Sequence, residues 1–118
     1  MQNFLKGFVY ACNGLISFFR YERNGKVQLC VAIIVVAFGW WFRLSKVEWL
    51  VVLVCIAVVL SLEMMNSAIE KLCNLVQPAY HPVIKTIKDI SAGAVLWVSI
   101  ISAIAGLIIF LPKIFAGL

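Results

Sequence analysis

Two carboxylates and two amides lie close together in an otherwise apolar part of the sequence. Glu63 and Glu70 occur in the segment EMMNSAIE, which follows the apolar run VEWLVVLVCIAVVLSL. On a helix, Glu63, Asn66 and Glu70 project to one side, and Ser67 and Asn74 extend the same polar stripe. A carboxylate at the centre of a transmembrane helix costs about 2.5 to 3.5 kcal/mol on insertion scales, so it needs a partner, a metal ion or a function. Carboxylates at this spacing suit a hard divalent cation, which prefers oxygen ligands.

Other polar groups flank the apolar stretches on what we predict to be the same side of a membrane. Glu22 and Asn24 precede the first stretch, and Lys88 and Asp89 precede the third. A divalent ion with a lysine beside it suits a phosphate-bearing ligand. The alternative is structural, because intramembrane Glu, Asn and Ser side chains can hydrogen-bond neighbouring helices. The residues alone leave both interpretations open.

The composition identifies the elements that must position these groups. The 118 residues are 64% hydrophobic and 13% charged, with a mean hydropathy of +1.07. Soluble domains carry about 25% charged residues, so this composition excludes a water-soluble globule. Because about 20 apolar residues span a bilayer core, the chain is long enough for about three transmembrane helices and no separate soluble domain.

We therefore predict an all-α membrane protein in which residues 1–118 form a single domain. Transmembrane spans are expected at about 27–44, 47–76 and 89–112, and Trp97 is expected to pack inside the third. Residues 4–20 predict an amphipathic helix, with a Phe-rich side opposite Lys6 and Arg20, that lies on the membrane surface. Pro78 and Pro82 end the helix of the second span.

The basic residues indicate how the chain crosses the membrane. Of ten Lys and Arg residues, seven lie in the N-terminal segment or in the 71–88 connection, and three lie in the first loop or near the C-terminus. Lys and Arg are enriched on the cytoplasmic side, so we expect the N-terminus and the second connection there. The net charge of +5 thus reflects membrane orientation and does not indicate nucleic-acid binding. The four cysteines form no CxxC pair and are interpreted as small core residues, not as a disulfide or zinc framework.

The segment SLEMMNSAIEKLCNLVQPAYHPVIKTIKDISAGAVL, preceded by YERN at 21–24, resembles the bacterial integral-membrane diacylglycerol kinase and undecaprenol kinase family. The resemblance covers nearly the whole chain and combines ExxNxAIE, YHP and KDxxAGAVL in a fixed order. It implies a homotrimeric helical bundle in the bacterial inner membrane, with an N-terminal surface helix and three transmembrane helices per chain. It also implies a kinase that uses Mg²⁺ to move the γ-phosphate of ATP to a membrane lipid alcohol, at sites between neighbouring chains. The nucleotide motifs GxxxxGK[ST] and GxGxxG are missing, so such a kinase must hold ATP by another architecture.

The resemblance also implies roles for individual residues. Glu63 corresponds to the general base on the lipid hydroxyl, and Glu22 and Glu70 correspond to the carboxylates that hold the metal ion. The positions implied around ATP are Tyr10, Glu22, Glu70, Ala79, Tyr80, His81, Lys88 and Asp89. Asn24, Asn66 and Asn74 are expected to support these groups, and Lys6 and Glu63 to meet the lipid. On local evidence alone, His81 in the proline-bracketed loop is more simply a solvated histidine.

Three positions depart from the family pattern. Asn74 stands where the family usually has an aspartate, Asn3 where some relatives have an arginine, and Gln28 where some carry a further acid. The sequence leaves diacylglycerol and undecaprenol open as substrates, because both present a small alcohol. The alternative function is a non-enzymatic small membrane oligomer, in which the Glu/Asn stripe lines an ion path or serves an accessory subunit. That alternative leaves Glu22 and the Lys88-Asp89 pair without a role, so a lipid kinase is favoured.

Overall fold

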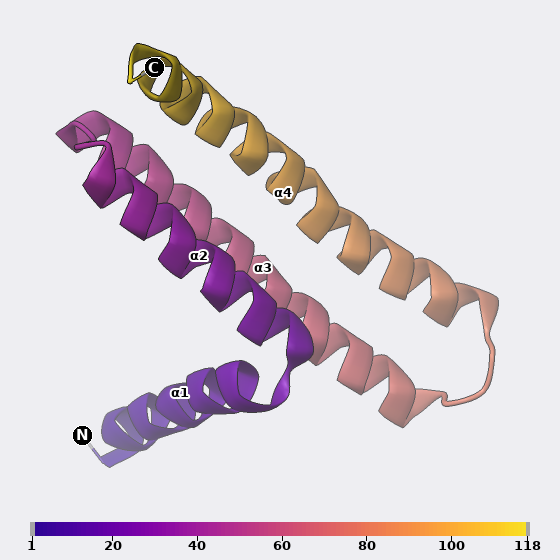
Figure 1. Cartoon of the computed structure of the whole chain (residues 1–118). Helices are drawn as coiled ribbons and strands as arrows, with labels where there is room; N and C mark the ends of the chain where they lie inside the picture. The colour runs from indigo at the N-terminus through magenta and orange to yellow at the C-terminus, as the bar shows by residue number, and fades with distance from the viewer. Residues whose placement is uncertain (1, 118) are drawn as a thin grey trace.

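The computed structural model describes residues 2–117, which form four helices and no strand. The helices are α1 (Gln2–Tyr21), α2 (Arg23–Trp41), α3 (Lys46–Val76) and α4 (Pro82–Ala116). Helices α2, α3 and α4 are each long and apolar enough to cross a membrane, which confirms the prediction of three spans. They lie side by side, whereas α1 diverges from the start of α2 (Figure 1).

Antiparallel packing of consecutive helices brings the ends of α2, α3 and α4 together. The α2–α3 loop lies at the same end of the molecule as the C-terminus, and the α3–α4 loop lies at the opposite end (Figure 1). The beginning of α2 and the second half of α3 are therefore neighbours. Through this arrangement, residues far apart in the sequence reach one end of the bundle.

The corner between α1 and α2 depends on a close approach of two backbones. Glu22, in an extended conformation with φ −90° and ψ 127°, interrupts the helix between them. Phe18 is buried there against Gly25, where an added Cβ would lie 2.7 Å from the backbone oxygen of Phe18. The other large apolar side chains of α1 are mostly exposed, as expected of a helix whose apolar side meets lipid or another chain.

The opposite end of the bundle is fixed by polar contacts at the start of α3. Ser45 and Glu48 form a capping box, in which each side chain accepts a hydrogen bond from the other residue's backbone N–H. Glu48 also forms an ion pair with Lys113 near the end of α4, at 3.0 Å. A small apolar core lies nearby; its buried members are Leu44, Val52 and Ile109, and Val35, Trp49, Ile56 and Phe110 pack against it.

The third helix begins ahead of the transmembrane span expected from about residue 89. Helix α4 begins at Pro82, because proline suits the first helical position and the His81 ring accepts the Val83 backbone N–H at 3.1 Å. Lys88 and Asp89 therefore lie on α4 and not in front of it. Similarly, Lys71 lies on α3 and not in the connection. Trp97, which we expected to pack inside the span, is 69% exposed.

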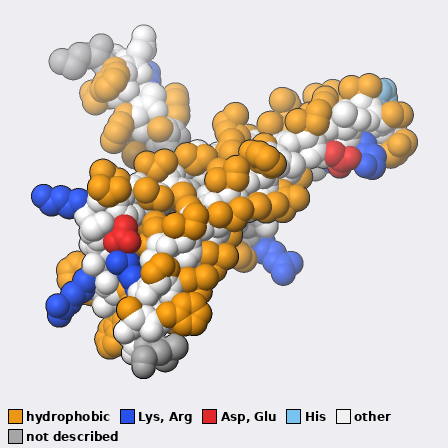
Figure 2. Space-filling model, turned by 90° about the horizontal axis from the view of Figure 1, so that it is seen from above, with side chains coloured by type: hydrophobic (Ala, Val, Ile, Leu, Met, Phe, Trp, Pro, Cys, Tyr) orange, Lys and Arg blue, Asp and Glu red, His pale blue; other side chains and the backbone are white. Residues whose placement is uncertain are grey.

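The bundle leaves most of its apolar surface uncovered. Hydrophobic side chains cover the length of the molecule in the space-filling view, whereas charged side chains gather mainly toward its ends (Figure 2). In water this distribution would be unfavourable, since soluble proteins rarely expose large continuous apolar patches. It fits a protein whose long helices face lipid or further chains.

Candidate functional site

The polar stripe on α3 is buried where it begins. Glu63 is 5% exposed, and Asn66 and Ser67 are also buried. The prediction of a polar stripe inside an apolar helix is thus confirmed for these three residues. Glu70 and Asn74 lie farther toward the end of α3 and are exposed. The stripe therefore runs from the packed interior toward the end of the bundle that carries the α3–α4 loop.

Helix α2 provides a hydrogen bond to Glu63. The side-chain amide of Gln28 donates to Glu63 Oε1 at 3.3 Å. The second carboxylate oxygen of Glu63, Oε2, is buried without a hydrogen-bond partner among the described residues. The same holds for Oδ1 of Asn66. The Asn66 amide donates to Glu70 Oε1 at 3.5 Å, the outer limit for a hydrogen bond. Two oxygen acceptors are therefore left available within one turn of α3.

The antiparallel register of α2 and α3 places Glu22 beside the exposed part of the stripe. Glu22 Oε1 lies 2.5 Å from the ammonium of Lys71, the residue that follows Glu70. Glu22 thus contacts α3 at the residue next to Glu70. The sequence analysis assigned Lys71 no role at this site, because its position next to Glu70 does not indicate which helix its side chain faces.

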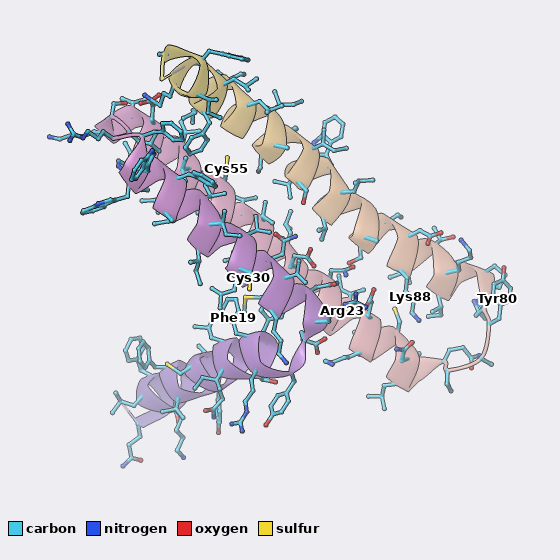
Figure 3. All side chains as sticks on the ribbon, viewed as in Figure 1. Phe19, Arg23, Cys30, Cys55, Tyr80 and Lys88 are labelled. Carbon is cyan, nitrogen blue, oxygen red and sulfur yellow. The ribbon has the colours of Figure 1, made fainter. Side chains whose placement is uncertain are left out.

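Helix α4 brings Lys88 to the same stripe. Its ammonium donates to Asn74 Oδ1 at 2.5 Å, one turn beyond Glu70. Asp89 instead pairs with Lys85, one turn earlier on α4, in an exposed ion pair of 2.6 Å. Figure 3 shows Lys88 between α3 and α4, close to the loop that connects them.

The loop of Ala79, Tyr80 and His81 forms the far boundary of this region. All three residues are exposed, and Figure 3 shows Tyr80 at the end of the molecule, beyond Lys88. About 20 Å of helix, at 1.5 Å per residue, separates Glu63 from the last residue of α3, Val76. The loop is therefore well separated from Glu63 and closer to Lys88.

Two predicted site residues are not brought to this region within one chain. Lys6 and Tyr10 are exposed on α1, which leads away from the corner at Glu22 (Figure 1). At 1.5 Å per residue, Tyr10 lies about 16 Å along α1 from Tyr21. Asn24, by contrast, is exposed in the first turn of α2, next to Glu22.

The donor set suits a metal ion that is bound jointly with a ligand. Residues 2–117 contain no cluster of three or more His, Cys, Asp or Glu side chains able to hold a metal by themselves. Mg²⁺, however, is usually bound through one or two carboxylates together with substrate phosphates. The carboxylates of Glu22 and Glu70 fit that requirement.

The four cysteines are free thiols distributed over α1, α2 and α3, and Figure 3 shows Cys30 and Cys55 on different helices.

A groove of about 380 Å³ lies between α2, α3 and α4. Its lining is mostly apolar and includes Val35, Ile56 and Phe110, with Ser99 and Ser102 contributed by α4. Gln28, the residue that contacts Glu63, also lines this groove.

Comparison with known proteins decides the family. Residues 9–110 match the family model described as prokaryotic diacylglycerol kinase. The chain belongs to this family. Membership confirms the prediction of a lipid kinase in the membrane, and the non-enzymatic alternative is not favoured.

Two relatives of this chain carry names that specify different lipids. The chain is 40% identical to the undecaprenol kinase of Bacillus subtilis (strain 168) over 114 residues, which cover 97% of this chain and 93% of that protein. It is 31% identical to the diacylglycerol kinase of a Synechocystis species over 113 residues, which cover 95% of this chain and 65% of that protein. The prokaryotic diacylglycerol kinase family therefore includes members similar to this one that carry either name.

Proposed function

We propose that this chain is an undecaprenol kinase, which transfers the γ-phosphate of ATP to the hydroxyl of undecaprenol and releases ADP. The choice of lipid is supported by the relative of that name, which matches nearly end to end at 40% identity. Diacylglycerol is the second candidate, supported by the relative that is 31% identical and of which this chain covers 65%. Both lipids would present the same chemical group to the site.

The observation that carries the chemistry is the buried carboxylate of Glu63, one oxygen of which has no partner among residues 2–117. As the lipid oxygen bonds to the γ-phosphorus, the bond from that phosphorus to the bridging oxygen of ADP breaks. The hydroxyl proton passes to Glu63 Oε2, which acts as general base. Because the transition state of phosphoryl transfer is loose, the remaining task of the protein is to position the reactants and neutralise the phosphate oxygens.

The other residues of the stripe are proposed to hold the nucleotide. Glu22 and Glu70 would bind Mg²⁺, which neutralises phosphate charge when it is bound. Lys88 would leave Asn74 to contact the phosphates, and Asp89 would lie close by on α4. Asn24 and Asn66 would orient Glu22 and Glu70 respectively, and Asn74 would hold Lys88 while no nucleotide is bound. The loop of residues 79–81 would contact the nucleoside, since Figure 3 shows its Tyr80 beyond Lys88, at the end of the molecule.

We propose further that residues 1–118 form one domain that assembles as a homotrimer in the bacterial inner membrane, with the N-terminus and the active site facing the cytoplasm. The distribution of seven basic residues against three supports this orientation. The extensive apolar surface supports assembly. Because α1 diverges from its own bundle, the Lys6 and Tyr10 of a neighbouring chain are proposed to complete each site.

The proposed function is tested by transfer of labelled γ-phosphate from Mg-ATP to undecaprenol and to diacylglycerol in mixed micelles. We expect labelled undecaprenyl phosphate. Glu63→Gln should lower turnover by about 10² or more with little change in nucleotide affinity, because that is the usual contribution of a general base. Glu48→Gln, the same change at the other end of α3, is the matched control and should retain activity.

Each alternative result has a defined meaning. Label only in diacylglycerol would reassign the substrate without changing the mechanism. Unchanged turnover in Glu63→Gln would remove the general-base role. Label in neither lipid, from a folded preparation, would contradict the proposed activity.

A further inference from the structure

The carboxylate of Glu63 is held by a residue that the reaction as described above does not use. Gln28 Nε2 on α2 donates to Glu63 Oε1 at 3.3 Å, across 35 positions of sequence. Glu63 is 5% exposed, and its Oε2 is the oxygen without a partner among the described residues. The two oxygens of one carboxylate are thus in different environments, one held by an amide and the other available.

We propose that Gln28 is a positioning residue for phosphoryl transfer: its amide holds Oε1 of Glu63 so that the free Oε2 is directed to the lipid hydroxyl. This inference rests on the proposed role of Glu63 as general base. The terminal torsion of a glutamate is broad and roughly twofold, so an unrestrained carboxylate would rotate between orientations. A donor on a different helix fixes that rotation as long as α2 and α3 remain packed.

The chemistry of an amide suits this task. The Gln28 side chain donates a hydrogen bond without adding a negative charge. Glutamine therefore holds the Glu63 carboxylate without placing a second ionisable group against it.

The experiment combines single substitutions with a double-mutant cycle. Gln28→Met keeps the approximate length of the side chain and removes the donor. We expect its kcat to fall about tenfold or more, as for loss of a hydrogen bond to a charged group. KM for Mg-ATP should stay within about twofold, because Gln28 acts through the base. Gln28→His, which retains a ring N–H donor, should recover part of kcat.

The cycle tests whether the effect passes through Glu63. In a Glu63→Gln background, Gln28→Met should lower the residual kcat by less than about twofold, because there is no base left to position. Ser102→Ala is the matched control, since it also replaces a polar side chain lining the same groove; it should leave kcat unchanged.

Two outcomes for kcat would overturn the inference and leave the proposed function intact: wild-type kcat in Gln28→Met, or an equal loss from Gln28→Met with and without Glu63. A rise in KM for Mg-ATP at constant kcat would likewise assign Gln28 to nucleotide binding and contradict positioning of the base. Failure of the proposed function would be seen separately, as label in neither lipid with the wild-type protein, and full activity in Glu63→Gln would remove the base that Gln28 is proposed to position.

Discussion

At the residue scale, the exposed carboxylates of the site are expected to behave differently from the buried one. Glu70 is exposed and Glu22 is partly exposed, so both can reach a hydrated ion, whereas Glu63 is enclosed. Glu22→Gln and Glu70→Gln should each weaken Mn²⁺ binding at least about tenfold in the presence of a non-hydrolysable ATP analogue. Electron paramagnetic resonance of the free ion measures this without turnover. Undiminished Mn²⁺ binding in both variants would exclude Glu22 and Glu70 as metal ligands. Glu63→Gln is the control and should bind Mn²⁺ as the wild type does.

Lys71 should act as a competitor for the metal at Glu22. Its ammonium lies 2.5 Å from Glu22 Oε1, and its side chain is 69% exposed. Lys71→Met should therefore strengthen Mn²⁺ binding about twofold to fivefold, the range expected for removing an exposed ion pair, with Lys71→Arg close to wild type. The difference should shrink at high salt, because exposed charges are screened. Weaker binding in Lys71→Met would show that the lysine assists the metal and does not compete with it.

Sequence reasoning predicted the stripe but not the environment of each member. Helical periodicity places Glu63, Asn66 and Glu70 on one side, and this follows from local geometry alone. That Glu63 is buried while Glu70 is exposed depends on how far α2 covers α3, which local patterns do not encode. For the same reason Gln28 was noticed only as a departure from a family pattern, and its contact with Glu63 required the structure.

At the element scale, the angle between α1 and α2 should depend on the absence of a side chain at Gly25. An added Cβ would lie 2.7 Å from the Phe18 backbone oxygen, and backbone cannot move aside cheaply. Gly25→Ala should thus open the corner and shift α1. Spin labels on the native Cys12 and Cys30, with Cys55 and Cys73 replaced by serine, would report a changed distance distribution. Gly14→Ala is the control, since nothing lies within 4 Å of its added Cβ; an unchanged distribution in Gly25→Ala would show that the corner tolerates a methyl group.

The expected spans and the observed helices do not share all their boundaries. The second span was expected at 47–76, and α3 covers Lys46–Val76. The first was expected at 27–44, whereas α2 covers Arg23–Trp41, and the third from 89, whereas α4 begins at Pro82. Apolarity marks where a helix enters the membrane core, whereas a helix begins where its first N–H groups are satisfied. Here the His81 side chain and Pro82 set that beginning.

At the scale of the whole molecule, one chain does not bring all the predicted site residues together. Residues of α2, α3 and α4 meet at one end of the bundle, whereas α1 carries Lys6 and Tyr10 away from it. The sequence could not predict this separation, because the direction of α1 depends on the three-dimensional geometry of the corner at Glu22. If the α1 of a neighbouring chain completes each site, then each site takes its bundle residues from one chain and its α1 residues from another. A substitution in the bundle and a substitution in α1 would then impair a given site through different chains.

Mixing of inactive chains tests this arrangement. One preparation carries Glu63→Gln and the other carries Tyr10→Ala, each first shown to have reduced activity as a homogeneous assembly. After random reassembly at equal amounts, a site works only where a chain with intact Glu63 meets a neighbour with intact Tyr10, so about a quarter of wild-type activity should return. Glu63→Gln mixed with Glu22→Gln should recover nothing, because both residues lie on the α2–α3 hairpin of one chain. If verified mixing gives no recovery in the first pair either, each chain must use its own α1, and α1 must then fold back toward the bundle from the direction it takes here.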